Sequence, residues 1–195
     1  RLGDPRHQRP RQRVNGIPMT LHPDIRRIET ARTILRPHAP DDFDAYAALW
    51  ADPEVTRFIG GKPFTREAAW SRFLNRTGLW PLLGFGFFAV TDRETGAFLG
   101  EAGFHDMKRD LTPSIEGSLE CGWGLSSAVA GKGLATEIVT ALVGWAGEHF
   151  PGRRLTAMIE VGHVRSIRVA EKSGFTAFAE TTYLGKPVTL FERRP

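Results

Sequence analysis

The sequence predicts a mixed α/β fold in which one central sheet carries helices on its faces. Apolar residues alternate with polar ones in some stretches and recur every three to four residues in others, which separates strands from helices. The resulting order of elements is β-α-α-β-β-β-α-β-α-β-β. Because strands and helices do not alternate one for one, a plain parallel βα array is excluded. At 195 residues the chain forms one domain with an N-terminal appendage.

Composition is typical of a water-soluble globular protein, with 41% hydrophobic and 25% charged residues. No apolar run approaches the ~18 residues of a membrane helix, so no membrane partner is expected. The first ten residues, RLGDPRHQRP, lack the apolar core of a signal peptide. A single cysteine excludes an internal disulfide and agrees with a reducing compartment. We therefore expect a cytoplasmic protein.

The positive charge is confined to the N-terminus. The net charge is +4, and residues 1–20 hold five arginines against one acidic residue, which accounts for all of it. Residues 21–195 are therefore neutral overall, and a basic nucleic-acid-binding surface is not indicated for them. We expect a basic tail over 1–20 and a folded domain over 21–195. The tail is expected to pack on its own domain or on a second copy, as in a homodimer.

The first elements are a strand and a helix. Residues 28–36 (IETARTILR) alternate as in a strand, and two prolines end it. Asp41 is the expected N-cap of a helix that runs to Trp50. The dipeptide Asp52-Pro53 should stop that helix.

A second helix follows a short bridge. Residues 54–61 predict an irregular connection that ends in a glycine pair. Thr65 is the expected N-cap of a helix over 66–80. Its predicted buried stripe consists of Trp70, Phe73 and Leu74.

Strand periodicity returns after the second helix. Residues 85–90 and 97–105 predict a hairpin with a five-residue connection, and a polar loop over 108–117 follows. In the C-terminal third, residues 153–160 predict a strand and 164–173 a helix that Gly174 ends. Residues 175–182 and 188–193 predict a final hairpin around Gly185-Lys186-Pro187.

The central stretch, LECGWGLSSAVAGKGLATE over 119–137, combines a strand, a glycine loop and a helix start. Leu119, Cys121 and Trp123 alternate with Glu120, Gly122 and Gly124, so the second face of the strand is mostly glycine. Such a face leaves the backbone bare for close approach.

The loop that follows, Ala130-Gly131-Lys132-Gly133-Leu134-Ala135, opens an amphipathic helix. Free amides and the positive end of a helix dipole form an anion site, most often for phosphate. The nucleotide P-loop pattern fails because Ser126 replaces its first glycine and Gly133 its hydroxyl residue. The dinucleotide pattern fails at Thr136. Glycines that only turn a strand into a helix remain an alternative at this point.

Two motifs make the chain resemble the GNAT superfamily of acetyl-CoA-dependent N-acetyltransferases. The pyrophosphate pattern [QR]-x-x-G-x-[GA] matches at Gly133 and Ala135 and departs at Ala130. The helix pattern N-x-x-S-x-x-V-x-E-K-x-G-F matches residues 163–175, with Ser166 retained and His163 in place of Asn. This pattern is similar to the branch that contains the ribosomal-protein N-terminal acetyltransferases.

The resemblance implies the GNAT fold, with a twisted mixed sheet of six to seven strands, splayed at the acetyl-CoA site, and about four helices. It implies acetyl-CoA as co-substrate and no metal; the six scattered histidines also lack ligand spacing. The amide near Leu125 would polarise the thioester carbonyl. The residues expected at the cofactor are Trp123, Gly124, Leu125, Ala130, Gly131, Lys132, Gly133, Leu134, Ala135, Thr136, His163 and Ser166.

Acyl transfer from a thioester to an amine needs a neutral amine, an oxyanion donor and a proton source for the thiolate. Glu120 is the expected base, or steers the amine through ordered water, and His105 is an alternative base. Ser166 is the expected acid, since Ala170 stands where many family members carry Tyr. Cys121, on the apolar strand face, is expected to be a buried hydrophobe rather than a nucleophile.

The acceptor implied by the resemblance is a primary amine, on a protein N-terminus or on a small molecule. The two early helices would wall its pocket. The alternative function is a non-catalytic GNAT-fold module that binds acyl-CoA as a sensor or interaction unit, which the departures at Ala130 and His163 motivate.

Overall fold

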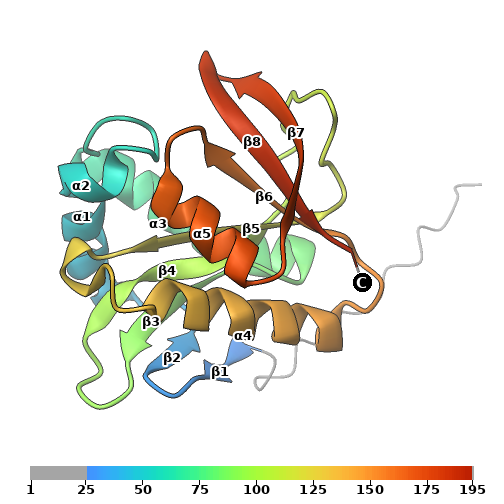
Figure 1. The fold of residues 1–195 in the computed structure, drawn as a ribbon. Coiled ribbons are helices and arrows are strands. Elements are labelled where there is room, and N and C mark those ends of the chain that lie inside the picture. Colours follow the sequence, from blue (N-terminus) through green and yellow to red (C-terminus); the bar gives the residue numbers. More distant parts are fainter. Residues whose placement is uncertain (1–25, 195) are drawn as a thin grey trace, which may run out of the picture.

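A computed structural model describes residues 26–194 as one eight-stranded sheet with helices on both faces (Figure 1). The strands lie in the order β1-β2-β3-β4-β5-β6-β8-β7. Their bounds are β1 Ile28–Glu29, β2 Thr33–Arg36, β3 Phe87–Asp92, β4 Phe98–His105, β5 Leu119–Leu125, β6 Leu155–Glu160, β7 Thr176–Tyr183 and β8 Lys186–Arg193. The α-helices are α1 Phe43–Ala51, α2 Pro53–Thr56, α3 Arg66–Leu83, α4 Leu134–His149 and α5 Val164–Lys172. The predicted mixed α/β class with one central sheet is confirmed.

One pair of strands is parallel, and it is the pair that separates. β5 and β6 share only the pairs Leu119↔Leu155 and Glu120↔Thr156, whereas β4 and β5 stay in register from Gly100↔Leu125 to His105↔Glu120. Beyond Glu120 the two parallel strands diverge, and a gap opens in the middle of the sheet (Figure 1).

The two faces of the sheet have different chemistry. On one face α4 packs its stripe, including Ile138, Leu142 and Trp145, on Phe88 and Phe104 in the main hydrophobic core. The opposite face lies under α1 and α3 and carries Glu101, His105 and Glu120, all buried. Because side chains alternate along a strand, Cys121 shares the core face and Glu120 faces the helices, as predicted.

The sheet has one strand more than expected because the first strand is split. In residues 28–36 a turn separates β1 from β2, and the hydroxyl of Thr30 accepts a hydrogen bond from the Thr33 amide at 2.9 Å. A short polar side chain that bonds its own backbone competes with the strand ladder in this way. The predicted single strand is therefore a small hairpin.

The structure also has one helix more than expected. The first residues of the segment expected to be an irregular bridge, 54–61, belong to the short helix α2. Asp52 ends α1 as predicted and also caps α2, accepting from the Glu54 amide at 2.9 Å. The N-cap of α1 is Asp42 rather than Asp41. The Asp42 carboxylate is held by Arg36 at 2.7 Å and by the Ala39 amide at 2.7 Å.

The stripe predicted for α3 is partly wrong. Thr65 caps the helix as expected, but Trp70 and Leu74 are 42% and 52% exposed, and only Phe73 of the three is buried. The buried face includes Arg76, which periodicity of apolar residues cannot reveal. A buried arginine needs a partner, and the sheet face below supplies it.

Within residues 26–194 no helix is long and apolar enough to cross a membrane, and no cluster of metal-ligating side chains is present. The basic tail predicted over 1–20 lies outside the described residues, so its packing and the predicted domain boundary stay predictions.

Candidate active site

The glycine loop ends in a helix start made of free backbone amides. Gly133 is the N-cap of α4 with φ of 75°, and no side chain caps the helix. Gly131 has φ of 78°, a conformation that glycine adopts without strain. The first amides of α4 therefore point out of the helix unpaired, as an anion site requires.

A cation that the sequence did not predict lies beside this loop. Arg32, in the turn between β1 and β2, donates to the Lys132 carbonyl at 3.0 Å and pairs with Glu137 in the first turn of α4 at 2.7 Å. The side chain of Lys132 itself points to solvent as an exposed residue. Arg32 is about 100 positions away in the chain, so no local motif could assign it to the loop.

The gap between β5 and β6 presents backbone amides. Where the strands are still paired, the Leu119 amide donates to the backbone carbonyl of Arg154 at 3.0 Å. Because amide directions alternate along a strand, the amides of Trp123 and Leu125 point to the same edge. At their level β6 has already moved away. An extended ligand entering the gap meets these N–H groups as an added strand would.

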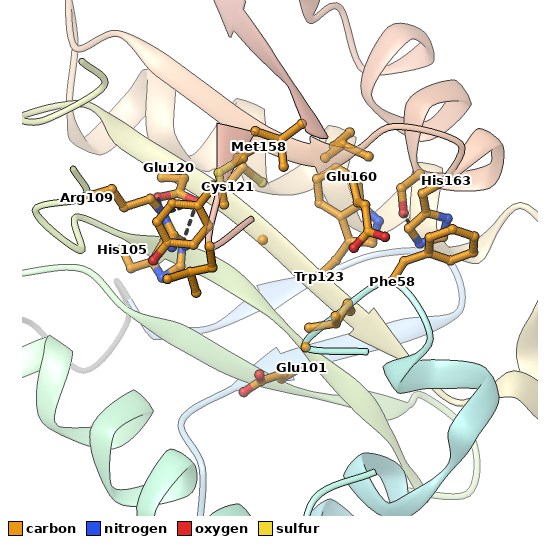
Figure 2. A pocket seen from close by; sticks show the side chains of 18 of the residues that line it. Phe58, Glu101, His105, Arg109, Glu120, Cys121, Trp123, Met158, Glu160 and His163 are labelled. Atoms are coloured by element: carbon orange, nitrogen blue, oxygen red, sulfur yellow. Dashed lines mark hydrogen bonds and ion pairs between the residues drawn. The ribbon is translucent and has the colours of Figure 1, made fainter. Parts of the chain in front are cut away.

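A cavity of about 350 Å³ lies over the gap and under α1–α3 (Figure 2). Figure 2 shows Glu120, His105 and Arg109 at one side of it and Glu160, His163 and Phe58 at the other. Its ionisable lining residues are Arg72, Arg76, Glu101, His105, Arg109, Glu120, Glu160, His163, Tyr183 and Lys186. The volume is at the small end for ligand pockets, which suits one small group beside a thioester.

The glycine face of β5 is not bare, contrary to expectation. A Cβ on Gly122 would lie 2.9 Å from the Phe87 ring, and one on Gly124 would lie 3.1 Å from the Trp50 ring. These glycines admit aromatic side chains of the protein itself, and Trp50 and Phe87 line the pocket together with Gly122. A sequence pattern identifies the close approach but not its partner.

Glu120 lies at one end of the pocket in a dense polar cluster. Its carboxylate accepts from Arg109 Nε at 2.8 Å and lies 3.2 Å from His105 Nε2. Burial alone would raise the pKa of Glu120, but the hydrogen bonds from His105 and Arg109 and the positive charge of Arg109 lower it to about 2. Glu120 is thus a buried carboxylate that stays ionised at neutral pH.

His105 has both ring nitrogens engaged. Arg76 Nη1 lies 2.9 Å from Nδ1, and because a guanidinium only donates, Nδ1 must accept. The proton then sits on Nε2, which donates to Glu120. Burial lowers the pKa of His105, consistent with this neutral tautomer. The His105 ring therefore orients Glu120, and Arg76 orients the His105 ring.

Ser166 and His163 lie together at the other end of the pocket. The Ser166 hydroxyl and His163 Nε2 are 2.8 Å apart, and the His163 ring stacks on Phe58 at 4.4 Å between centroids. Burial lowers the pKa of His163. The histidine that replaces the Asn of the family pattern thus holds the serine hydroxyl within reach of the gap.

The other predicted residues divide among the pocket, the loop and the end of β5, where Gly124 and Leu125 lie. Trp123 and Cys121 line the pocket, and burial raises the pKa of the Cys121 thiol, which disfavours a thiolate nucleophile. Residues 130–136 form the loop and the first turn of α4, away from Glu120. Sequence reasoning missed Glu101, Arg109 and Tyr183. The guanidinium of Arg109 lies 4.7 Å from the Tyr183 ring centroid, across a contact that no spacing rule predicts.

Comparison with known proteins gives a consistent family match. Residues 32–176 match the family described as an acetyltransferase (GNAT) domain. A Bacillus licheniformis protein described as the uncharacterized N-acetyltransferase p20 is 27% identical over 147 residues, covering 75% of this chain and 80% of that protein. A GnaT-family acetyltransferase structure from Bordetella pertussis has a TM-score of 0.76 at 30% identity, covering 86% of this chain and 98% of that one.

Two more distant structures share the fold and differ in their acceptors. One is RimL, a ribosomal alpha-N-protein acetyltransferase bound to coenzyme A, with a TM-score of 0.70 at 16% identity over 86% of this chain and 97% of that one. The other is an aminoglycoside acetyltransferase, AAC(6')-Ib, bound to coenzyme A, with a TM-score of 0.69 at 18% identity over 83% and 94%.

Proposed function

The chain belongs to the GNAT family and is an acetyl-CoA-dependent acyltransferase, and we propose that it transfers the acetyl group directly to a primary amine. The observation that carries this proposal is the position of Glu120. An ionised, buried carboxylate lies in a small pocket over the gap at which the Trp123 and Leu125 amides point. The Trp123 amide is three residues along β5 from Glu120, so it is the nearer of the two possible oxyanion donors to an amine held there.

The proposed reaction needs no covalent enzyme intermediate. The amine nitrogen attacks the thioester carbonyl carbon, the C–S bond breaks, and the CoA thiolate leaves with a proton. The Trp123 amide would donate to the carbonyl oxygen as it becomes negative. The Leu125 amide expected from the sequence lies five residues along β5 from Glu120, about 16 Å by strand geometry, so it would contact a more distant part of the thioester chain. The amides of residues 131–136 would bind the CoA pyrophosphate at the start of α4, with Arg32 as a neighbouring cation.

Of the two roles expected for Glu120, we favour steering over full proton removal. A carboxylate with a pKa of about 2 is a weak base, but its charge attracts an ammonium group and stabilises the positive nitrogen that forms on attack. Water in the pocket takes one proton from the ammonium group before attack, which gives the neutral amine, and a second proton from the nitrogen after attack. His105 and Arg109 keep the carboxylate in place.

Ser166 is the proposed acid for the thiolate. Its hydroxyl proton would pass to sulfur while water returns a proton to the serine oxygen, and His163, 2.8 Å away, would hold the hydroxyl in the orientation for that transfer. Ala170 is fully buried and has no proton to give.

The acceptor is proposed to be a single primary amine, on a protein N-terminus or on a small molecule. Every pocket carboxylate has a cationic neighbour: Glu120 has Arg109, Glu160 has Lys186 and Glu101 has two arginines. A polycation such as an aminoglycoside would find no unpaired carboxylates to bind it. We also propose a cytoplasmic location, where acetyl-CoA is supplied and the free thiol of Cys121 stays reduced.

The test is CoA release from acetyl-CoA in a thiol-detection screen over amines and peptide N-termini, with calorimetric titration of acetyl-CoA in parallel. We expect micromolar binding and amine-dependent release. Binding without release for any amine would favour the alternative, a non-catalytic acyl-CoA-binding module. Absence of acetyl-CoA binding would contradict both.

A further inference from the structure

Buried polar atoms without hydrogen-bond partners gather in one place. Among residues 26–194, the buried side-chain nitrogens and oxygens without a partner are His38 Nδ1 and Nε2, Tyr46 Oη, Trp50 Nε1, Arg76 Nε and Glu101 Oε2. All belong to side chains around Glu101, which lines the acceptor pocket. Native proteins contain few buried polar atoms without a hydrogen-bond partner, and a bound water or ligand commonly supplies the partner.

Glu101 sits on β4 under α3, and its two oxygens have different surroundings. Oε1 accepts from Arg72 Nη2 at 2.9 Å and lies 3.6 Å from Arg76 Nε, which is too far for a hydrogen bond. Oε2 lies 3.7 Å from His38 Nε2 and has no hydrogen bond. The two arginines therefore crowd one oxygen of a single carboxylate.

This end of the pocket carries an excess positive charge. Two guanidinium groups face one carboxylate, and burial lowers the pKa of His38, which keeps that ring neutral. Burial also lowers the pKa of Arg76 to about 10, against the raising effect of Glu101. The other ion pairs of the pocket, Glu120 with Arg109 and Glu160 with Lys186, balance one for one. An uncompensated buried charge is costly unless a partner is supplied.

Most of the unpaired atoms can donate a hydrogen bond and therefore need an acceptor. Trp50 Nε1 and Arg76 Nε are donors only, and Arg72 stacks over the Trp50 ring at 4.0 Å, which brings the guanidinium and the indole together. The Tyr46 hydroxyl lies near the Glu101 carboxylate, which is the acceptor available to it, and burial first and the Glu101 charge second raise its pKa. The donors left for a ligand are therefore Trp50 Nε1 and Arg76 Nε. A group that complements this set must accept hydrogen bonds and carry negative charge. A carboxylate meets both needs.

The Glu101 end and the Glu120 end belong to one cavity. Glu101 and His105 are four residues apart on the same face of β4, about 13 Å by strand geometry. Gly103 and Gly122 pair between them, and the Phe87 ring, which Gly122 admits, lines the cavity there. Arg76 links the ends, since it lies near Glu101 and bonds His105. One acceptor molecule can therefore reach both.

We propose that the Glu101 end is a second subsite, in which Arg72, Arg76 and the Trp50 N–H bind a carboxylate of the acceptor while its amine lies beside Glu120. This rests on the proposed function and narrows its substrate class to amino acids or acidic peptide N-termini. The separation of the two ends favours acceptors whose carboxylate is several bonds from the amine.

The test compares matched acceptors in the CoA-release assay. ω-Amino acids from β-alanine to 6-aminohexanoate, and peptides with an acidic side chain near the N-terminus, are paired with their carboxamides. We expect kcat/KM to be about tenfold or more higher for the acid than for the amide, as for a charge-assisted hydrogen bond. Equal rates for acid and amide would overturn the subsite and leave amine acetylation intact.

Variants separate the subsite from general pocket damage. Arg72→Gln, which removes the excess charge, should bring the acid-to-amide ratio close to one, and Arg72→Lys should retain part of it. Trp50→Phe should lower the ratio by about threefold through one lost hydrogen bond. Lys186→Gln, which removes a pocket cation already paired with Glu160, should leave the ratio in place. A ratio that falls with Lys186→Gln but not with Arg72→Gln would contradict the assignment.

If no acceptor is turned over, the affinity of the CoA-bound protein for acid and amide probes tests the subsite. The CoA-bound protein is then titrated by calorimetry with 6-aminohexanoate and with 6-aminohexanamide. We expect tighter binding of the acid by about tenfold and loss of that difference in Arg72→Gln. Equal affinities, or no binding of either probe, would overturn the subsite. Absence of CoA release across the amine panel would count against the proposed function alone.

Discussion

The two ends of the site consist of different chemical groups. The loop at the start of α4 consists of backbone amides and glycines with positive φ, near the surface, with Arg32 as its neighbouring cation. The acceptor pocket consists of ionised side chains from α3, β4 and β5, most of them buried and interlocked. The first relies on local chain geometry, and the second on contacts between residues far apart in sequence.

This difference predicts which property each change will alter. Changes in the loop should weaken acetyl-CoA binding and leave chemistry in the bound state intact. Changes in the pocket should alter turnover and acceptor choice and leave acetyl-CoA affinity near its original value.

Glu120→Gln should lower kcat by about 100-fold or more, because a neutral amide cannot stabilise the charge on the attacking nitrogen. Its acetyl-CoA dissociation constant, measured by calorimetry, should change by less than about threefold. Glu160→Gln, the matched change to the carboxylate paired with Lys186, should cost much less turnover. Unchanged kcat in Glu120→Gln would rule out a catalytic role for this carboxylate.

The pocket carboxylate should also make stability depend on pH. The pKa of Glu120 falls from 4.5 to about 2 on folding, so its stabilising contribution is complete above 4.5 and is lost as the pH drops toward 2. The contribution is on the order of a few kcal/mol. In urea unfolding across this window, Glu120→Gln should show a shallower loss than the parent protein. Parallel curves would contradict the buried ion pair.

Gly133→Ala should raise the acetyl-CoA dissociation constant by about tenfold. A Cβ at φ of 75° is strained by roughly 1–2 kcal/mol, and relief of that strain would turn the amides away from the pyrophosphate. Gly144→Ala, in the middle of α4 where a Cβ meets nothing within 4 Å, should instead stabilise the protein. If both variants bind acetyl-CoA like the parent, the loop is not the pyrophosphate site.

Ser166→Ala should lower kcat by about tenfold, less than Glu120→Gln, because a thiolate needs modest help to leave. His163→Asn, which restores the residue of the family pattern, should keep most activity. The check is the pH profile of kcat: the serine variant should lose rate mainly at high pH, where water supplies the proton poorly. Equal rates at every pH would remove Ser166 from the acid role.

Cys121→Ala should change kcat/KM by less than about threefold. Burial raises the pKa of this thiol, so it stays protonated and takes no acetyl group. Trapping with labelled acetyl-CoA, followed by mass spectrometry, should find no acetylated cysteine. A stable acetyl-Cys121 that is discharged by amine would show that the pocket works through a covalent intermediate.

The same division explains what the sequence could reveal. The α/β order, the strand alternation around Glu120 and the two family patterns depend on residues close together, and these predictions are confirmed for fold and family. The extra strand and the extra helix depend on single side chains, Thr30 and Asp52, that cap backbone locally.

Local sequence patterns could not predict the side-chain contacts at the acceptor end of the site. Arg76 looks like a solvent-facing arginine on a helix, and its burial follows only from the carboxylate of Glu101, 25 residues on, which lies beneath it in the fold. Arg32 reaches the glycine loop from a turn about 100 positions away in sequence. Side-chain sites assembled from distant elements need the three-dimensional structure to be recognised.

The most direct test of direct transfer is the initial-rate pattern with both substrates varied. If acetyl-CoA and the amine occupy the gap and the pocket together, double-reciprocal plots should intersect, and CoA should appear only when both are present. Parallel lines, with CoA released from acetyl-CoA before any amine is added, would contradict a reaction in which the amine beside Glu120 attacks the thioester itself.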